Sequence, residues 1–498
     1  MNQAVRALAN NRRCLVMGLG AFGGGLGVTK TLIEAGAKQV LVTDLAPAEK
    51  LSASLAALQP LIESERVVLR LGEHLESDFQ AAEVVIANPA VPKPWHNRFL
   101  LAARAVGATV TTELRLALEG VPRDRVIAIT GSAGKSTTSA MVAHMLHGHG
   151  RTAILAGNIG GSLLQLAPAL GARDWLVLEL SSFMLWWLGA ESCRNPWVSR
   201  IGALTNLSDN HLDWHGDASH YSRSKSCICG VGQSAFLTRF DRDDAATAHK
   251  FAMLPAGAWW RDATTHTQSE TRTEDAVEAW QQMQPAHAAH EQPSAHENLH
   301  THRAHGLNAQ IESHPELADA CPLPGLHNRR NAMLALQIAH AALACDGELV
   351  QHAALAQRLR DFRGLPHRLA LVHEHHGVRW FDDSKATTPE ATLLALSCFA
   401  DCARVHLIAG GYDKGSNLSA IAALAPQLAG LYAIGATTNS LCSYGGNRCE
   451  TLENAVQMIR AKLKPLDVVL LSPGCASWDQ FENYEDRGRQ FAALALPR

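Results

Sequence analysis

The sequence predicts an α/β protein with three domains, each a mainly parallel sheet flanked by helices. Three observations support this fold class. The chain has 498 residues, which is more than a single hydrophobic core usually holds. Short apolar strands alternate with helical segments along most of its length. Glycine-rich turns at 18–27 and 130–137 each follow a strand and precede a helix, as in ligand-binding α/β domains.

The composition is that of an ordinary soluble protein, with 47% hydrophobic residues, 18% charged residues and a net charge of -3. Such a chain has no overall attraction to nucleic acid or to an anionic membrane, so we expect neither as a partner. No apolar run reaches the roughly 20 residues of a membrane helix, and the N-terminus lacks the apolar core of a signal peptide. The 11 cysteines form no C-x-x-C pair, which favours reduced thiols. We therefore expect a cytoplasmic protein, and a monomer.

The first domain is predicted over 1–120 and opens with a βαβ unit. Strands are expected at 13–18, 39–44, 67–72 and 83–91, with helices at 28–37 and 97–108. The first turn, "GLGAFGG" (18–24), contains G-x-G-x-x-G, and Asp44 lies 21 residues after Gly23. This spacing is typical of Rossmann-like dinucleotide-binding domains, in which the acidic residue contacts a ribose.

The middle domain is predicted over 121–362 and resembles a phosphate-loop ATPase domain. Strands are expected at 125–130, 174–180 and 200–207, with a helix at 138–150. The stretch "TGSAGKST" (130–137) ends like a phosphate loop, but the long form of that loop needs a glycine where Ile129 stands. Position 131 supplies the first glycine instead, so the loop is two residues short.

The context of this turn nevertheless favours phosphate binding. Gly131 and Gly134 allow a tight turn, and the following helix N-terminus attracts anions. Lys135 can reach the β- and γ-phosphates of ATP, and Ser136 or Thr137 can hold Mg²⁺ through a hydroxyl group.

Charged residues follow two further buried strands of the middle domain. Glu179 ends the strand at 174–180, where a buried carboxylate is costly unless it is ion-paired or binds a metal. His211 and Lys225 come after the strand at 200–207, near the sheet edge where open α/β sheets bind ligands. From the residues alone, a structural ion pair, a structural histidine and a surface lysine stay open as alternatives.

The rest of the chain divides into an insertion and a third α/β domain. Between about 241 and 320, nine histidines occur and apolar periodicity fades, which favours a poorly ordered insertion over a metal-binding tract. The third domain is predicted over 363–498. Its strands are expected at 378–384, 404–411, 431–435 and 467–473.

Ten segments taken together resemble the Mur ligases, and within them the branch that adds D-glutamate. They are "TGSAGKST", "GNIGGSL" (157–163), "LELSSF" (178–183), "TNLSDNHLDWHG" (205–216), "YSRSK" (221–225), "LPGLHNRRNA" (323–332), "GLPHR" (364–368), "DDSKATTPEA" (382–391), "AGGYDKGSNLS" (409–419) and "LSPGCASWDQFENYEDRGRQF" (471–491). They follow the family's order over about 13–495, and jointly they are highly specific. The family uses the short loop T-G-x-x-G-K-[ST], commonly with Asn where Ala133 stands.

The resemblance implies an ATP- and Mg²⁺-dependent ligase. It would join D-glutamate to UDP-N-acetylmuramoyl-L-alanine in cytoplasmic peptidoglycan precursor synthesis. ATP would convert the L-alanyl carboxylate into an acyl phosphate, which the amine of glutamate attacks. Neither nucleic acid nor a membrane is implied as a partner.

The resemblance also implies roles for individual residues. Lys135, Glu179, His211 and Lys225 would be catalytic, with Ser136, Glu179, His211 and a carbamylated Lys225 around Mg²⁺. The ATP-binding residues would be Gly131, Ser132, Ala133, Gly134, Lys135, Ser136, Thr137, Asn331, Arg368 and Asp383, so that ATP bridges two domains. Leu19, Gly20, Ala21, Asp44 and Asn158 would bind the UDP substrate, and Thr387, Lys414, Ser477, Trp478 and Tyr484 would surround glutamate.

Three alternatives stay open at this point. A Rossmann-type oxidoreductase would explain the first turn but not the phosphate loop. A phosphate-loop switch or motor would hydrolyse ATP without depending on an amino acid. A sister ligase for L-glutamate, or a folate-type polyglutamate synthetase, would share the motifs, because residues that clamp two carboxylates do not reveal which side the amine faces.

Overall fold

The structure is a computed structural model. It describes residues 3–20, 24–159, 162–166, 170–171, 173–189, 192, 196–208, 210–228, 235–238, 320–348, 350–413 and 415–496. The chain forms two compact units, one of Met1–Pro315 with Met333–Leu355 and the other of Glu316–Ala332 with Ala356–Arg498. The expected insertion at about 241–320 lies outside the described residues except for its last position. The candidate site residues Ala21 and Lys414 also lie outside them.

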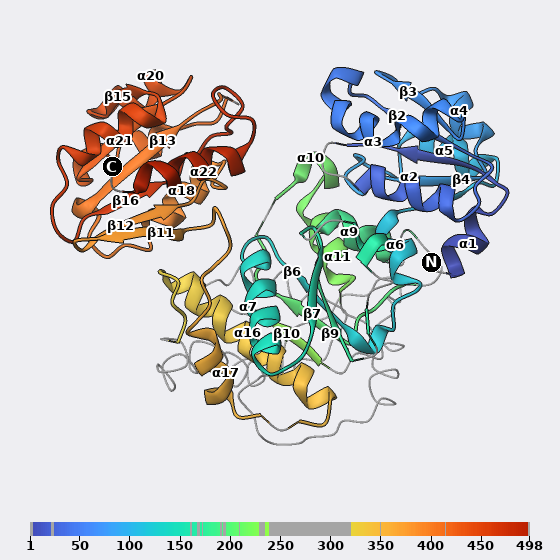
Figure 1. Cartoon of the computed structure of the whole chain (residues 1–498), viewed down its shortest axis with the longest axis horizontal. Helices are drawn as coiled ribbons and strands as arrows, with labels where there is room; N and C mark the ends of the chain where they lie inside the picture. Colours follow the sequence, from blue (N-terminus) through green and yellow to red (C-terminus); the bar gives the residue numbers. More distant parts are fainter. Residues whose placement is uncertain are drawn as a thin grey trace, which may run out of the picture. The chain divides into compact units, whose positions relative to one another are not determined.

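The first unit begins with a five-stranded parallel sheet in the order β3-β2-β1-β4-β5. Strands β2, β3 and β4 of this sheet are labelled in Figure 1. Its strands are β1 (Arg13–Met17), β2 (Gln39–Asp44), β3 (Val67–Leu71), β4 (Val84–Ala87) and β5 (Thr109–Thr111). Its helices are α1 (Gln3–Ala9), α2 (Gly24–Glu34), η1 (Ala48–Leu51), α3 (Ser52–Glu63), α4 (Glu76–Ala81), α5 (Arg98–Ala105) and α6 (Glu113–Leu118). The strand order reverses between β1 and β4, which confirms the Rossmann-like prediction and marks the edge where such sheets bind ligands.

A second parallel sheet in the first unit has the order β10-β9-β6-β8-β7. Its strands are β6 (Val126–Thr130), β7 (Ala153–Gly157), β8 (Trp175–Glu179), β9 (Ile201–Leu204) and β10 (Ala235–Thr238). The other helices of this part are η2 (Arg123–Arg125), α7 (Lys135–Gly148), α8 (Leu163–Leu166), α9 (Ser182–Leu188), α10 (Leu212–His215) and α11 (Ala218–Ser226), together with α16 (Leu326–Cys345) and α17 (His352–Leu359), each of which belongs partly to the second unit. The central strand β6 lies between β8 and β9, so the residues that follow these three strands share one sheet edge.

Tryptophan side chains pack the two sheets of the first unit against each other. Trp186 and Trp214, from the second sheet's helices, share one buried cluster with core residues of the first sheet. The Trp95 ring centroid lies 5.2 Å from those of both Trp186 and Trp214. Trp214 Nε1 also donates a hydrogen bond to Ala90 O at 3.2 Å. These contacts hold the α10 segment against the loop that follows β4.

We expect Trp214→Phe to destabilise the first unit more than Trp197→Phe does. Both indoles are buried, so both substitutions remove similar apolar area. Only Trp214 loses a hydrogen bond, because Trp197 Nε1 has no partner among the described residues. The difference in unfolding free energy should be about 1 kcal/mol. Urea unfolding followed by circular dichroism measures it, and equal effects of the two variants would contradict the proposed contribution of this bond.

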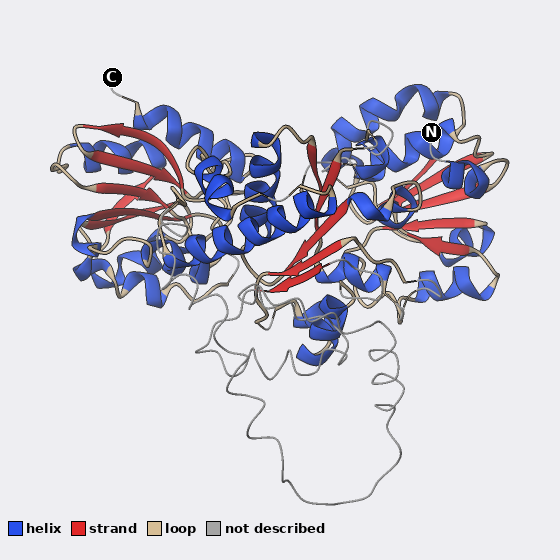
Figure 2. Ribbon diagram, turned by 90° about the horizontal axis from the view of Figure 1, so that it is seen from below, coloured by secondary structure: helices blue, strands red, loops and turns tan. Residues whose placement is uncertain are grey.

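The second unit contains a six-stranded sheet in the order β11-β12-β16-β13-β14-β15. In Figure 2 the strands of this sheet (red) lie between helices (blue). All its pairs are parallel except β11 with β12. The strands are β11 (Ala370–His375), β12 (Val378–Asp382), β13 (Val405–Gly410), β14 (Gly430–Ile434), β15 (Asn447–Glu450) and β16 (Val468–Leu471). The helices are α18 (Pro389–Leu396), η4 (Cys402–Arg404), α19 (Ser419–Ala422), η5 (Ala425–Gln427), α20 (Thr438–Leu441), η6 (Cys442–Tyr444), α21 (Leu452–Arg460) and α22 (Tyr484–Ala495). Separate buried clusters cover its two faces, as expected for a doubly wound sheet.

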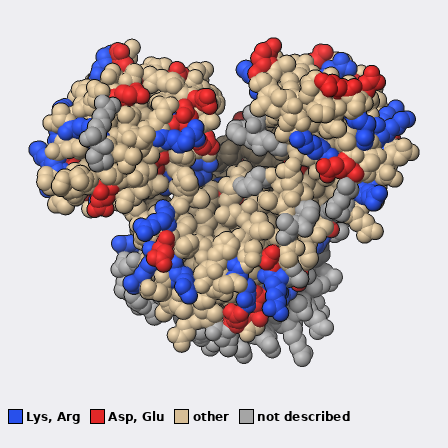
Figure 3. Space-filling model, in the orientation of Figure 1, with Lys and Arg blue, Asp and Glu red and all other residues tan. Residues whose placement is uncertain are grey.

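The predicted fold class of three mainly parallel α/β sheets is confirmed, whereas the exact domain boundaries stay a prediction. Among the described helices, none is long and apolar enough to cross a membrane. Basic and acidic side chains are interspersed over the face drawn in Figure 3. The absence of a nucleic-acid partner stays a prediction.

Candidate active site

Asp44 closes the turn that follows β1. Its Oδ2 accepts hydrogen bonds from the backbone N–H groups of Leu19 at 2.8 Å and Gly20 at 3.0 Å. Its Oδ1 accepts one from the N–H of Ala46 at 2.8 Å. The structure thus brings together Leu19, Gly20 and Asp44, three of the residues expected to bind the UDP substrate.

A cavity of about 120 Å³ lies beside this turn, at the reversal of strand order in the first sheet. It is lined by the ends of β1 and β4, including Gly18 and Asn88, and by Gly157 at the end of β7. Glu113 also lines it and accepts a hydrogen bond from Ser162 Oγ. Burial raises the pKa of Glu113. The cavity therefore extends from the first sheet to the second, where Asn158 follows Gly157 directly.

The phosphate loop leaves β6 in a conformation that glycine favours. Gly131 has φ +150° and Gly134 has φ +80°. A Cβ atom at position 131 would lie 1.9 Å from Thr205 Oγ1, so even alanine would clash there. Lys135 Nζ donates hydrogen bonds to Gly131 O at 2.9 Å and Ser132 O at 3.2 Å. The ammonium group is therefore held against its own loop, at the start of the 14-residue helix α7.

Ala133 enters this loop through its backbone and not through its side chain. Its carbonyl accepts a hydrogen bond from Thr205 Oγ1 at 2.5 Å, and its N–H donates to Asn206 Oδ1 at 2.8 Å. The residue itself is exposed. An asparagine at this position would therefore have room, and the loop does not need it.

We expect Ala133→Asn to change the KM for ATP by less than about threefold, because both backbone hydrogen bonds are retained and a new exposed polar group contributes little. Steady-state kinetics with varied ATP measures this. A tenfold fall in KM would show that the alanine weakens the loop.

Glu179 ends β8 beside the phosphate loop and is only 1% exposed. Its Oε1 accepts a hydrogen bond from Asn158 Nδ2 at 3.0 Å. Its Oε2 is buried and has no partner among the described residues. A buried carboxylate oxygen without a donor is costly unless a cation or a ligand completes it. Asn158, expected beside the substrate's diphosphate, thus holds Glu179 in place.

Lys225 lies in α11 with its side chain directed into the same site, and it is 2% exposed. Its Nζ donates to Thr130 Oγ1 at 3.2 Å and to Gly131 O at 2.9 Å. Burial lowers the pKa of Lys225 well below its usual value; the charge of Lys135 lowers it further, and Glu179 raises it. A surface lysine, one of the open alternatives, is therefore wrong.

His211 precedes α10 in a left-handed conformation, with φ +52°. Its ring makes an edge contact with Phe183 at 4.9 Å between centroids. Partial burial lowers the pKa of His211, Asp213 raises it, and the charges of Lys225 and Lys135 lower it further. The lowered pKa favours the neutral imidazole, which is the form that can bind a metal.

This set of residues fits Mg²⁺, although the described residues contain no group of three or more His, Cys, Asp or Glu side chains placed for a metal. Mg²⁺ usually takes one or two protein carboxylates and completes its shell with water and phosphate oxygens. The unpartnered Oε2 of Glu179 supplies the acceptor that such a site needs. The buried hydroxyl residue Ser136, at the start of α7, belongs to the same loop.

The second unit positions the other expected ATP-binding residues. Asn331 is buried in α16. Arg368 lies between His367 and Leu369, which have φ +61° and +49°. Such strained backbone is found most often at functional sites, where the surroundings hold it. Leu369 N donates to Asp383 Oδ1 at 3.1 Å, so the arginine loop is tied to the expected ribose-binding acid.

Two family domains match the chain. Residues 129–339 match the Mur ligase middle domain, and residues 367–475 match the Mur ligase glutamate ligase domain. A UDP-N-acetylmuramoylalanine–D-glutamate ligase from Roseiflexus sp. (strain RS-1) is 34% identical, over 97% of this chain and 98% of that protein. The chain belongs to the Mur ligase family. As a Mur ligase, it is an ATP-dependent, amide-forming ligase.

Further relatives agree with this assignment. A UDP-N-acetylmuramoylalanine–D-glutamate ligase from Geobacter metallireducens is 32% identical, over 97% of both chains. A solved UDP-N-acetylmuramate–alanine ligase from Thermotoga maritima shares the fold, with a TM-score of 0.51 and 14% identity over 97% of this chain and 98% of that one. This Mur ligase therefore aligns with its relatives over nearly its whole length.

Asp383 should make nucleotide binding by this Mur ligase depend on pH. The pKa of Asp383 is raised to about 7, chiefly by burial. The neighbouring Asp382 carboxylate also raises this pKa, whereas hydrogen bonds from Ser472 and Leu369 and the charge of Arg368 lower it. Because the pKa is raised in the folded state, the protonated carboxyl group of Asp383 favours the folded protein. This contribution to the unfolding free energy is lost as the pH rises through 7. If Asp383 contacts the ribose as expected, its ionised carboxylate would accept a hydrogen bond from a ribose hydroxyl more strongly than its protonated form.

The KM for ATP should consequently fall as pH rises from about 6 to 8. Asp383→Asn should raise the KM and remove most of this dependence. Asp401→Asn, at an exposed acid of the same unit, serves as the control. ATP kinetics across this range measure the effect, and an unchanged pH dependence in Asp383→Asn would contradict it.

Four of the five expected glutamate-binding residues of this Mur ligase are described: Thr387, Ser477 and Trp478 lie in two loops of the second unit, and Tyr484 begins α22. Lys385 Nζ donates to Tyr484 Oη at 3.1 Å. Ser477 is buried, whereas Trp478 is 64% exposed, with its ring centroid 5.7 Å from that of Tyr412. Thr387, half-buried, follows Lys385 in its loop.

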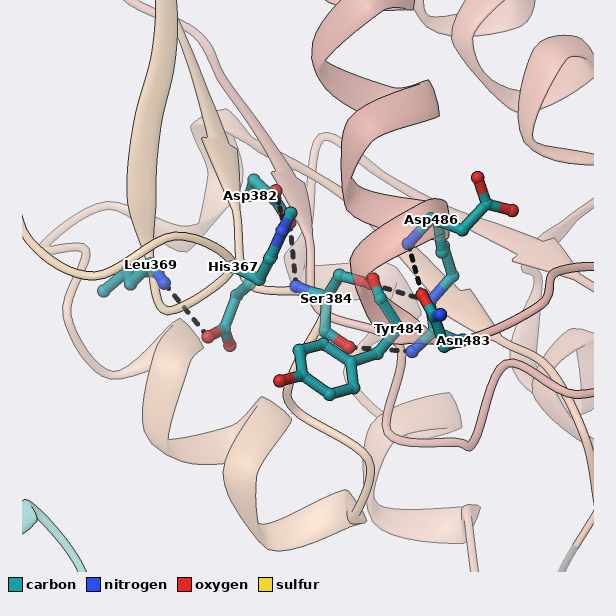
Figure 4. A network of polar contacts seen from close by, with 9 residues as sticks. His367, Leu369, Asp382, Ser384, Asn483, Tyr484 and Asp486 are labelled. Atoms are coloured by element: carbon teal, nitrogen blue, oxygen red, sulfur yellow. Dashed lines mark hydrogen bonds and ion pairs between the residues drawn. The ribbon is translucent and has the colours of Figure 1, made fainter. Parts of the chain in front are cut away.

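Arg487 donates hydrogen bonds to both loops, and it was not identified as a functional residue from the sequence. It is buried, and its guanidinium donates to Ser384 Oγ at 2.9 Å, Ser384 O at 2.8 Å and Cys475 O at 3.2 Å. His367 Nδ1 and the N–H of Ser384 both contact Asp382, and Ser384 Oγ donates to Tyr484 O (Figure 4). A charged residue inside a helix gives no sequence signal of burial, although Arg487 does lie within a family motif.

Proposed function

We propose that this Mur ligase adds D-glutamate to UDP-N-acetylmuramoyl-L-alanine at the expense of ATP. The observation that carries the proposal is the meeting of three groups at one sheet edge: the phosphate loop after β6, Glu179 at the end of β8 and buried Lys225. The substrates follow from the relatives, which are named UDP-N-acetylmuramoylalanine–D-glutamate ligases and align over nearly the full chain.

The phosphate loop would bind the ATP triphosphate. Lys135 begins α7, whose N-terminus favours anions, and its ammonium would turn from the loop carbonyls to the phosphates. Ser136, Glu179 and His211, with Lys225, would hold Mg²⁺. Bound there, Mg²⁺ would neutralise charge that develops on the phosphates during phosphoryl transfer.

Lys225 would act as a carbamate. Its lowered pKa leaves a neutral amine, whose lone pair attacks the carbon of CO₂ to form a C–N bond while one N–H proton is released to solvent. The product is an anion in a site that otherwise holds two lysines beside Glu179. The carbamate would then supply a second negatively charged group for the metal.

The cavity beside Asp44 would hold the UDP end of the nucleotide sugar. It lies at the carboxyl edge of the first sheet and reaches Gly157, next to Asn158 and Glu179. A substrate seated there with its uridine near Leu19 would extend its peptide toward the phosphate loop. Ala21 belongs to this expectation but lies outside the described residues.

The second unit would bind the adenosine part of ATP and glutamate. Asn331, Arg368 and Asp383 are expected to contact the nucleotide. Thr387, Ser477, Trp478, Tyr484 and Lys414, of which Lys414 lies outside the described residues, are expected around glutamate. Arg487 would position the two loops that carry Thr387 and Ser477.

Phosphate release tests the proposal directly. The full chain is assayed with UDP-N-acetylmuramoyl-L-alanine, ATP and Mg²⁺, with D-glutamate, L-glutamate or neither. We expect phosphate release to require D-glutamate. Release that needs neither glutamate would point to a nucleotide hydrolase, and a preference for L-glutamate would move the protein to a sister branch of the family.

We further propose that the protein works in the cytoplasm as a monomer. The substrate is a soluble nucleotide sugar, and both substrate seats are expected within one chain. Size-exclusion chromatography with light scattering measures the oligomeric state; a stable dimer at assay concentrations would contradict this part.

A further inference from the structure

Asn206 makes several hydrogen bonds with the phosphate loop, although it is not among the residues expected in the site. It lies just beyond β9, and its Oδ1 accepts hydrogen bonds from the N–H groups of Ser132 at 3.0 Å and Ala133 at 2.8 Å. Its backbone carbonyl also accepts from the N–H of Ser132, at 3.1 Å. The amides of two consecutive loop residues, Ser132 and Ala133, thus donate to one side chain.

The neighbours of Asn206 fasten the same half of the loop. Thr205 Oγ1 donates to Ala133 O at 2.5 Å. Ser132 Oγ donates to Ser208 O at 2.8 Å and accepts from Ser208 N at 2.9 Å. The whole span from Ser132 to Ala133 is therefore tied to the segment that follows β9.

These contacts explain how a loop with two residues fewer than the long form stays ordered. A long phosphate loop has additional backbone to wrap around the phosphates. Here the carboxamide of Asn206 occupies hydrogen-bond donors that would otherwise need a bound phosphate or water. Because the loop is held before ATP arrives, less conformational entropy is lost on binding.

We propose that Asn206 is a positioning residue for ATP, which rests on the proposed function of the loop. It holds the amides of Ser132 and Ala133 turned toward β9. In contrast to the expectation that these two residues bind ATP, the phosphate contacts are then made by Lys135 and the first turn of α7. The ligands affected by Asn206 are nucleoside di- and triphosphates, because a nucleoside monophosphate has no β- or γ-phosphate to reach the phosphate loop.

The test uses the full chain and the substitution Asn206→Ala. We expect its Kd for ATP, measured by titration calorimetry, to rise on the order of tenfold, as the loss of two neutral hydrogen bonds predicts. The Kd for AMP should change less than about twofold, since it depends little on the phosphate loop. Hydrogen exchange of the loop peptide without nucleotide should become faster in the variant.

Asn97→Ala is the matched control. Asn97 Oδ1 likewise accepts two consecutive amides, from Phe99 at 3.1 Å and Leu100 at 3.2 Å, at the start of α5. It should lower stability without changing the Kd for ATP. Asn206→Asp keeps the acceptor oxygen, so it should retain the slow exchange of the loop, while its negative charge still weakens ATP binding.

Three results would overturn the inference: wild-type ATP affinity in Asn206→Ala, equal loss of ATP affinity in Asn97→Ala, or fast loop exchange in Asn206→Asp. The proposed function fails separately. If the wild-type chain itself binds no ATP, the phosphate loop is misassigned; if it binds ATP and Asn206→Ala binds equally well, only the role of Asn206 is wrong.

Discussion

Lys225→Ala should lower kcat on the order of 10²–10³-fold, and a small carboxylate such as acetate should restore part of it. The substitution removes the amine that would carry the carbamate, and it leaves a space beside Thr130 and Gly131 that a small anion can enter. An added carboxylate would then supply the missing negative charge. Phosphate release over a range of acetate concentrations measures the recovery.

Labelled bicarbonate gives an independent measurement of the same modification. With ¹³C-bicarbonate, the wild-type protein should show a carbamate carbon signal that Lys225→Ala lacks. Lys38→Ala, at an exposed lysine, should keep both the signal and full activity. Loss of activity without rescue and without a labelled signal in the wild type would mean that Lys225 acts as an amine.

Glu179→Gln should reduce kcat by a similar factor of about 10²–10³ while leaving stability unchanged or higher. Glutamine has nearly the same shape and keeps an oxygen to accept from Asn158 Nδ2. The substitution removes a buried charge whose second oxygen has no partner among the described residues, and such a charge opposes folding. Activity and stability should therefore respond in opposite directions.

Kinetics over a range of Mg²⁺ concentrations, together with thermal unfolding, check this prediction. Higher Mg²⁺ should recover little of the activity, because the lost ligand is replaced by a neutral amide. Glu119→Gln, at an exposed glutamate that pairs with Arg115, is the control and should change neither property by much. A clear fall in the unfolding temperature of Glu179→Gln would indicate a structural ion pair instead.

Sequence patterns located the long buried strands with small errors at their ends. The strand expected at 39–44 is β2, Gln39–Asp44, and the one expected at 125–130 is β6, Val126–Thr130. Continuous apolar runs between glycines mark strands that are buried on both faces. The strands β5, β7, β10, β11 and β15 went unrecognised. Each lies at an edge of its sheet, where a strand need not be a long apolar run buried on both faces.

The predicted first residues of the helices were less accurate than the predicted ends of the strands. The helix expected at 138–150 begins at Lys135, because the last residues of the phosphate loop already form its first turn. The helix expected at 28–37 similarly begins at Gly24. Glycine is a poor helix former. A helix that begins inside a glycine-rich ligand-binding loop is therefore predicted to start too late.

By itself, the sequence determined the fold class and the order of the motifs, because these depend on local pattern and residue type. The roles of Lys135, Glu179 and Lys225 rest on the family resemblance and stay predictions. Only the tertiary structure decided which distant groups meet. Asn158 reaches Glu179 from the neighbouring strand, and Asn206 reaches Ser132 across 74 positions of chain. Such partners follow from strand order and register, which bring separate strand ends to one edge and which no local pattern encodes.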